Sequence, residues 1–223
     1  MGKLLGQLLE ASVVSLEIFA LTLVFAVPLA LPIALGRMSR SRLVRAPIHL
    51  YILVMRGTPL ILQILFIYFA PKNLLDALGL PELASAVGAS FDRFPAVIVA
   101  FTLNYAAYFA EIYRGGIQSI PRGQWEAAQV LGFTRADTFF RVILPQVVKR
   151  ILPASANEVI TLVKDTALAH TIGVIELYRV AYNASNRDFS TTPLFVAGVF
   201  YFVMNWAVSE GFLRWERRLE YYR

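Results

Sequence analysis

Residues Ile18–Leu35 read IFALTLVFAVPLALPIAL, a run of 18 residues without a charge. A helix needs about 20 largely apolar residues to cross the hydrocarbon core of a bilayer, so this run with its neighbours is long enough for one crossing. It has no small-residue cleavage site and no basic start beyond Lys3, features that a secretory signal peptide would show. The sequence therefore predicts a retained transmembrane helix here.

The rest of the chain has the composition of a membrane protein. Of its 223 residues, 57% are hydrophobic and 16% are charged, whereas about a quarter of the residues are charged in soluble domains. The mean hydropathy is +0.59. The sequence contains no cysteine, which excludes disulfides, thiolate catalysis and cysteine-based zinc sites. Four further apolar segments bring the prediction to about five spans in one all-α integral membrane domain over residues 1–223: Pro47–Ala70, Phe94–Tyr113, Leu152–Val174 and Pro193–Leu213.

The basic residues predict the orientation of these spans, because short cytoplasmic loops are rich in Lys and Arg. The connections 71–93 and 176–192 are poor in cations, whereas three others are rich in them. The rich ones carry Arg37, Arg40, Arg42 and Arg45; Arg114, Arg122, Arg135, Arg141, Lys149 and Arg150; and Arg214, Arg217, Arg218 and Arg223. We therefore expect the N-terminus outside and the C-terminus in the cytoplasm. Cations placed between apolar runs indicate membrane topology and not nucleic-acid binding.

The largest predicted cytoplasmic loop covers about residues 114–150. Pro121 suits the first position of a short helix of about 10 residues, and Gly132 is a natural stop for it. Thr134 to Asp137 fits a variant of the capping box and opens a second, amphipathic helix, which Pro145 is expected to interrupt. A helix as short as the first one is marginal by itself in water, so the chain or a partner must hold it.

The short helix carries residues suited to a contact with another protein. Ala127 and Ala128 let another backbone come close, and Glu126 offers a charge for an Arg or Lys. Trp125 is a large anchor of the kind common at binding hot spots. In the alternative interpretation the helix lies at the membrane interface with Trp125 among the headgroups, and helix physics alone leaves both interpretations open.

The loop resembles the EAA loop of permease subunits in bacterial ABC importers. Glu126-Ala127-Ala128, Gly132 and Ile143-Leu144-Pro145 keep that pattern of an E-A-A triplet, a Gly and a hydrophobic-Leu-Pro group. Other stretches are similar to the polar amino acid permeases, the histidine, glutamine, arginine and opine group. These are Arg56-Gly-Thr-Pro59 with Gln63, Asn104–Arg114 (NYAAYFAEIYR), and Lys164-Asp165-Thr166, and the likeness covers roughly residues 12 to 220.

The resemblance implies a type I ABC importer permease fold with a cytoplasmic coupling helix, working by alternating access in the bacterial inner membrane. It implies as partners a second permease, identical or homologous, an extracytoplasmic binding protein for an amino acid, membrane lipid, and an ATPase dimer that binds ATP and Mg²⁺. No G-x-x-x-x-G-K-[ST] occurs here, so ATP hydrolysis needs a separate chain. We expect a permease subunit without a cofactor, not an enzyme. The implied ATPase-coupling residues are Trp125, Glu126, Ala127, Ala128, Gly132, Leu144 and Pro145.

Polar and ionisable residues inside the apolar segments are costly and by default mark a pathway. Asn104, Tyr108 and Glu111 fall at i, i+4 and i+7 and share one helix face. The alternative is helix–helix contact, which is favoured for Glu111 because Arg114 lies one turn on; for Asn104 both interpretations stay open. The substrate-path candidates are Arg56, Thr58, Asn104, Tyr108, Glu111, Glu158, Thr161, Lys164 and Asp165.

Three of these positions have a structural alternative. Lys164 and Asp165 offer both charges that a zwitterionic amino acid needs, but an ion-pair network or a dimer seam is slightly favoured. Pro59 should kink its helix and free a carbonyl, so Arg56 is expected to satisfy carbonyls there before it meets a substrate carboxylate. His170 is expected to make a polar contact, since nothing near it supplies a second metal ligand.

Two other function classes deserve comparison with an importer. A membrane enzyme would use the Glu and Lys-Asp groups for acid–base chemistry, but the sequence shows no nucleophile–base pair or metal set. A channel or scaffold subunit would need no nucleotide. The enzyme would also leave the cytoplasmic loop without a task.

Overall fold

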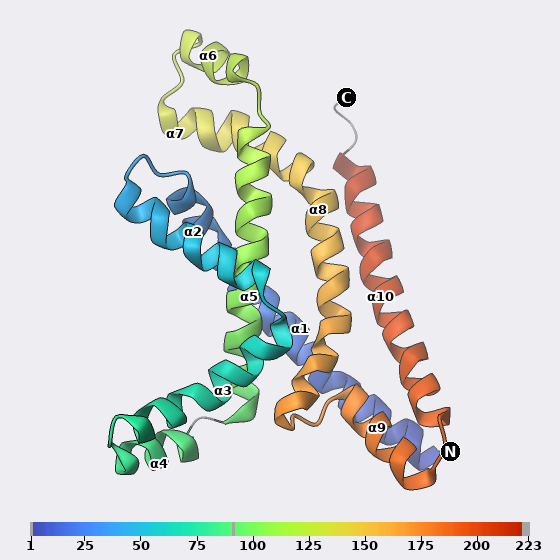
Figure 1. Cartoon of the computed structure of the whole chain (residues 1–223). Helices are drawn as coiled ribbons and strands as arrows, with labels where there is room; N and C mark the ends of the chain where they lie inside the picture. The colour runs from blue at the N-terminus through green and yellow to red at the C-terminus, as the bar shows by residue number, and fades with distance from the viewer. Residues whose placement is uncertain (1, 91, 220–223) are drawn as a thin grey trace.

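Figure 1 shows the computed structural model of the chain, which describes residues 2–90 and 92–219. Throughout these two ranges the ordered elements are helices. In chain order they are α1 (Gly2–Arg37), α2 (Arg42–Gly57), α3 (Leu60–Ala77), α4 (Pro81–Ser90), α5 (Arg93–Gln118), α6 (Arg122–Val130), α7 (Arg135–Asp137), the π-helix η1 (Thr138–Ile143), α8 (Leu144–Asp165), the 3₁₀-helix η2 (Thr166–Ile172), α9 (Leu177–Asp188) and α10 (Thr192–Leu219).

Within the described ranges, four helices are long and apolar enough to cross a membrane: α1, α3, α5 and α10. The weakest predicted span, Leu152–Val174, is the charged second part of α8 followed by η2, and it is not among the four. α8 nevertheless runs beside α5 and α10 (Figure 1). α1 starts at the α9 end of the molecule and α10 finishes at the α6 end. Because the two termini lie at opposite ends of the molecule, the chain must cross the membrane an odd number of times. This agrees with the predicted topology, in which the N-terminus lies outside and the C-terminus lies in the cytoplasm.

The predicted span Pro47–Ala70 is wrong as a single helix. α2 ends at Gly57 and α3 begins at Leu60, with Thr58 and Pro59 extended between them. A proline disfavours the helical conformation of the residue before it, which places the break at Thr58. The two helices meet beside α5 and diverge, α2 toward the α6 end and α3 toward α4 (Figure 1). The kink expected at Pro59 is therefore a complete break between two half-helices.

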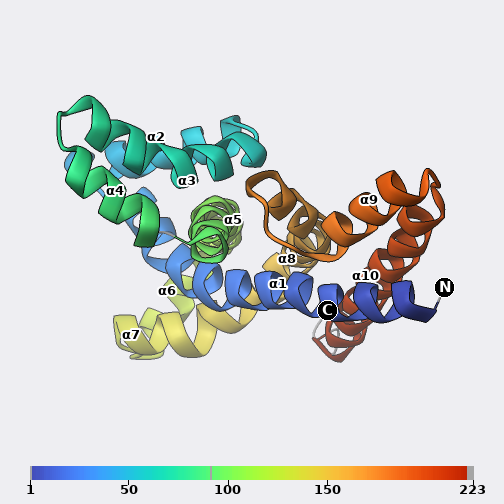
Figure 2. The ribbon, with the colours of Figure 1, turned by 90° about the horizontal axis from the view of Figure 1, so that it is seen from below.

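α5 is the central helix, and Figure 2, which looks along it, shows α1, α3 and α8 around it. The main core contains the large side chains Phe101, Tyr105 and Phe109 of α5, each 2% exposed or less. The face of α1 that packs into this core is built from small residues, namely Ala26, Ala30 and Ala34, all fully buried. Small residues let helix backbones approach closely, which is how helices associate where lipid replaces water.

The short helix of the basic loop forms as predicted. α6 spans 9 residues, although Pro121 precedes its first residue instead of occupying it. Gly132 adopts a left-handed φ of +79°, and the Phe133 N–H donates to the Ala128 carbonyl at 3.1 Å, the bond of a Schellman end. Thr134 caps the next helix, since its Oγ1 accepts from the Asp137 N–H at 3.1 Å. The predicted helix end at Gly132 and the predicted helix start at Thr134 are therefore confirmed.

The prediction that Pro145 interrupts the second helix is wrong. α7, η1 and α8 follow one another without a gap, and Pro145 lies in the first turn of α8. The Leu144 N–H donates to the Phe139 carbonyl, a π-type bond five residues back. A proline inside an α-helix lacks an N–H and clashes with the carbonyl four residues earlier. The wider π turn just before Pro145 relieves both problems, so the helix continues.

Candidate functional site

The break between α2 and α3 is closed by two buried amides. The Asn104 side chain donates to the Met55 carbonyl and to Gln63 Oε1, both at 3.0 Å. Gln63 Nε2 donates to the Met55 carbonyl at 2.9 Å and to Thr58 Oγ1 at 2.9 Å. A carbonyl without a partner inside a membrane costs several kcal/mol. Asn104 therefore makes a helix–helix contact, and Gln63 and Asn104, not Arg56 as expected, satisfy the carbonyls at the break.

Arg56 lies next to the predicted stripe of α5. Its guanidinium carbon is 5.2 Å from the centre of the Tyr108 ring, and its Nη1 is 3.9 Å from Glu111 Oε2. Glu111 is held more tightly by Arg114, whose Nη2 donates to Oε2 at 2.7 Å, so the predicted pair is confirmed. The Arg56 side chain remains 44% exposed. Because Glu111 is shared with Arg114, Arg56 retains capacity for another anion.

The candidates on α8 divide between two faces. Asp165 turns toward α5, where it accepts a 2.7 Å hydrogen bond from the buried hydroxyl group of Tyr105. Glu158 is half-buried and interacts electrostatically with Arg56. Thr161 and Lys164 are exposed. The structure thus gathers Arg56, Thr58, Asn104, Tyr108 and Glu111 in one place, with Glu158 in electrostatic reach, and leaves Thr161 and Lys164 outside.

α6 presents an inner and an outer face. Trp125 is half-buried and packs with Ile120, Ile143 and Val147, and Ala128 is 3% exposed. These two residues hold the helix to its own chain and do not project from it. The outer face carries the exposed residues Gly123, Glu126, Ala127 and Val130, and Val130 is 88% exposed. Helical spacing from the inward-facing Trp125 could have assigned Val130 to the outer face, but the sequence interpretation did not use it.

The helices α5 and α8, which precede and follow the loop that carries α6, approach each other closely. A Cβ added to Gly116 would lie 2.2 Å from Ile151 Cγ2. Gly116→Ala should therefore lower the free energy of unfolding by about 1–3 kcal/mol, the usual cost of overpacking. Thermal unfolding of the purified protein measures this. Gly115→Ala is the matched control, since its Cβ would meet nothing within 4 Å; equal stability of the two variants would contradict the close approach.

Two polar features lie at the end of the molecule opposite α6. Glu176 is fully buried, and its carboxylate caps α9 by accepting from the Tyr178 and Arg179 N–H groups, each at 2.7 Å. Burial raises the pKa of Glu176, and these N–H groups oppose that shift. The sequence interpretation counted Glu176 only as a loop charge. His170 makes the predicted polar contact, because Nδ1 lies 2.7 Å from the Ala167 carbonyl oxygen.

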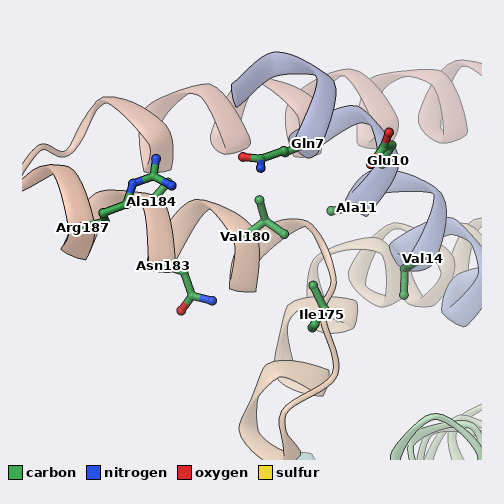
Figure 3. Close-up of a pocket in the computed structure, with 9 residues that line it drawn as sticks. All are labelled: Gln7, Glu10, Ala11, Val14, Ile175, Val180, Asn183, Ala184 and Arg187. Carbon is green, nitrogen blue, oxygen red and sulfur yellow. The ribbon is translucent and has the colours of Figure 1, made fainter. Parts of the chain in front are cut away.

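A groove of about 480 Å³ runs between α1 and α9 at the same end (Figure 3). Its walls include Gln7 and Glu10 of α1 and Asn183 and Arg187 of α9. Arg187 donates to both oxygens of Asp188, which lowers the pKa of Asp188. Over residues 2–90 and 92–219, no three His, Cys, Asp or Glu side chains gather as metal ligands.

Residues 26–219 match the family described as "Binding-protein-dependent transport system inner membrane component". The chain belongs to this family. The L-cystine transport system permease protein TcyB of Bacillus subtilis (strain 168) is 38% identical over 204 residues, 91% of this chain and 82% of that protein. The octopine transport system permease protein OccM of Rhizobium radiobacter is 35% identical over 213 residues, 93% of this chain and 84% of the relative.

A solved structure, "Crystal structure of an amino acid ABC transporter with histidines", contains a chain with the same fold. Its TM-score is 0.83 at 34% identity, covering 98% of this permease and 96% of that chain. The predicted type I ABC importer permease fold is therefore confirmed. The permease is a multi-pass membrane subunit of an ABC import system and is not itself an enzyme.

Proposed function

We propose that this permease is one transmembrane half of an ATP-driven amino acid importer in the bacterial inner membrane. Its whole length, residues 1–223, acts as one membrane domain with a coupling loop at about residues 114–150. This proposal is supported mainly by the similarity, over about nine-tenths of the chain, to permeases named for cystine and for octopine. The partners are a second permease, identical or homologous, an extracytoplasmic binding protein, surrounding lipid and a separate ATPase dimer that holds ATP and Mg²⁺.

The outer face of α6 docks on the ATPase. Glu126 and Ala127 are exposed on it, and Val130 is an apolar side chain 88% exposed at its centre. An exposed apolar side chain between a charge and a small residue suits a partner groove. The remaining coupling residues transmit the movement: Trp125 and Ala128 fix the helix to its own chain, Gly132 closes it, and Leu144 and Pro145 begin the continuous helix into the membrane.

The substrate path runs past the break between α2 and α3. Arg56 faces this path with an exposed guanidinium, which matches the geometry of a carboxylate. The ring of Tyr108 makes a cation–π contact with that guanidinium. Glu111 partly neutralises the guanidinium. Thr58 and Asn104 fix the backbone at the break between α2 and α3 through their hydrogen bonds. Glu158 and Asp165 supply negative charge for the substrate ammonium group. Thr161 and Lys164 continue the path along the exposed side of α8 or meet the second permease.

Substrate-stimulated ATP hydrolysis tests this function. The permease, its ATPase and its binding protein are reconstituted together and screened across amino acids. We expect stimulation by a narrow set of amino acids, and Arg56→Leu should raise the apparent KM for them at least about 10-fold, the loss of one charge-assisted contact. Arg56→Lys should recover part of the affinity. ATP-independent flux would contradict the importer and favour a channel, and chemical turnover by the isolated chain would favour an enzyme.

A further inference from the structure

The end of the permease opposite α6 has an apolar core of its own. Leu8 of α1, Leu177 and Ala181 of α9, and Ala197 of α10 form a buried cluster separate from the main core. The main core begins further along α1, with Ile18 as its first fully buried residue. Figure 1 shows the start of α1, α9 and the start of α10 together at this end. We call residues 2–17, 177–188 and 192–204 the outer unit.

One carboxylate reaches all three helices of the outer unit. Besides capping α9, Glu176 Oε2 accepts a 3.0 Å hydrogen bond from the Tyr201 hydroxyl of α10. It also lies 3.5 Å from Ser15 Oγ of α1, and Ser15 Oγ accepts from the Leu177 N–H at 3.3 Å. Capping α9 requires only the backbone N–H groups. The contacts with Ser15 and Tyr201 exceed that need and join α9 to its two neighbours.

The burial of Glu176 strengthens this junction. The side chain is fully buried, and it accepts hydrogen bonds from backbone N–H groups and from the hydroxyls of Ser15 and Tyr201. A buried polar group that loses a hydrogen-bond partner keeps its full desolvation penalty, whereas an exposed group regains water. Removing one donor therefore weakens the junction more than losing an ordinary surface hydrogen bond would.

Leu8 of α1 packs with Leu177 and Ala181 of α9 on one side of this helix pair. The groove of about 480 Å³ opens between these two helices on the side of Gln7 and Asn183 (Figure 3). Along the groove the two helices lack the dense van der Waals contacts that hold interiors rigid. The hydrogen bonds at Glu176 therefore add to a packing contact on one side of the pair in setting the position of α9 relative to α1.

We propose that Glu176 is a positioning residue that makes the outer unit move as one piece during the transport cycle. This inference rests on the proposed importer function. α1 and α10 both continue from the outer unit toward the α6 end, so a displacement of the unit by the binding protein is carried inward along two continuous helices. Without the junction, α9 moves independently, and events outside no longer stimulate ATP hydrolysis.

The test compares Glu176→Gln and Tyr201→Phe with the wild-type complex of permease, ATPase and binding protein. Tyr201→Phe keeps the ring and removes the hydroxyl that donates to Glu176 from α10, so it carries the test if Glu176→Gln fails to assemble. Tyr182→Phe of α9 is the matched control outside the junction. Hydrogen–deuterium exchange of residues 177–188 should rise at least about 10-fold in both junction variants, as expected when a buried polar group loses a hydrogen-bond partner. Exchange in α5 should stay unchanged.

The same variants should retain the basal ATPase rate but lose about 10-fold of the stimulation by binding protein and amino acid. Unchanged exchange in α9 would overturn the junction. Increased exchange with wild-type stimulation would overturn its role in transport. Failure of the proposed function is distinguishable, because then the wild-type complex shows no stimulation by any amino acid while the exchange measurement still reports on the junction.

Discussion

Glu126→Arg combined with Val130→Asp is expected to abolish transport while the permease still folds. Both side chains lie on the exposed outer face of α6, so the changes put no charge into the core. At a docking interface, the loss of a central apolar contact and the reversal of a charge cost about 2 kcal/mol or more. The affinity for the ATPase should therefore fall at least about 30-fold.

Pull-down of the ATPase by the purified permease measures this affinity. Gln129→Arg provides the matched control, because Gln129 lies on the flank of α6 between the two faces and the substitution introduces the same side chain as Glu126→Arg. Thermal unfolding of the variants verifies that the membrane fold is intact. Wild-type binding and transport in the double variant would remove α6 from the coupling mechanism.

Gln63→Leu and Asn104→Leu are expected to destabilise the permease strongly. Each substitution removes donors to the Met55 carbonyl, and Gln63→Leu also removes the donors to Thr58. A buried polar group left without a partner costs about 1–3 kcal/mol. The double variant should lose less than the sum of the single effects, because both amides belong to one network.

Thermal unfolding of the purified permease checks this prediction, and Asn157→Leu on the exposed side of α8 is the control with the same chemical change. The protein that still assembles should keep its apparent substrate affinity, since Asn104 is engaged by helix contacts. Normal stability together with altered substrate affinity would instead place Asn104 in direct contact with the substrate.

Local signals were enough to predict much of the loop. Gly132 and Thr134 act on neighbouring backbone groups, and the structure shows both ends as expected. Pro59 likewise marked the place of the break. Pro145 was misjudged because a π turn can accommodate a proline, and no residue type announces a π turn.

The remaining features depend on contacts between distant residues. Helical spacing places Trp125 and Ala128 on one face of α6, but it does not say that this face packs on Ile143 and Val147. Gln63 meets Asn104 from 41 residues away, and Glu176 meets Ser15 across 161 residues. Such partners become visible only when the helices are arranged in space, so the sequence alone treated Glu176 as an ordinary loop charge.

Coupling through α6 requires the ATPase to cover the outer face of this helix, and thiol labelling measures that cover. The chain contains no cysteine, so Ala127→Cys introduces a single reporter on that face. Phe189→Cys, at a side chain 98% exposed at the opposite end, serves as the reference. We expect the ATPase to suppress labelling at position 127 and to leave position 189 unchanged. Equal labelling of position 127 with and without the ATPase would show that the ATPase does not dock on the outer face of α6.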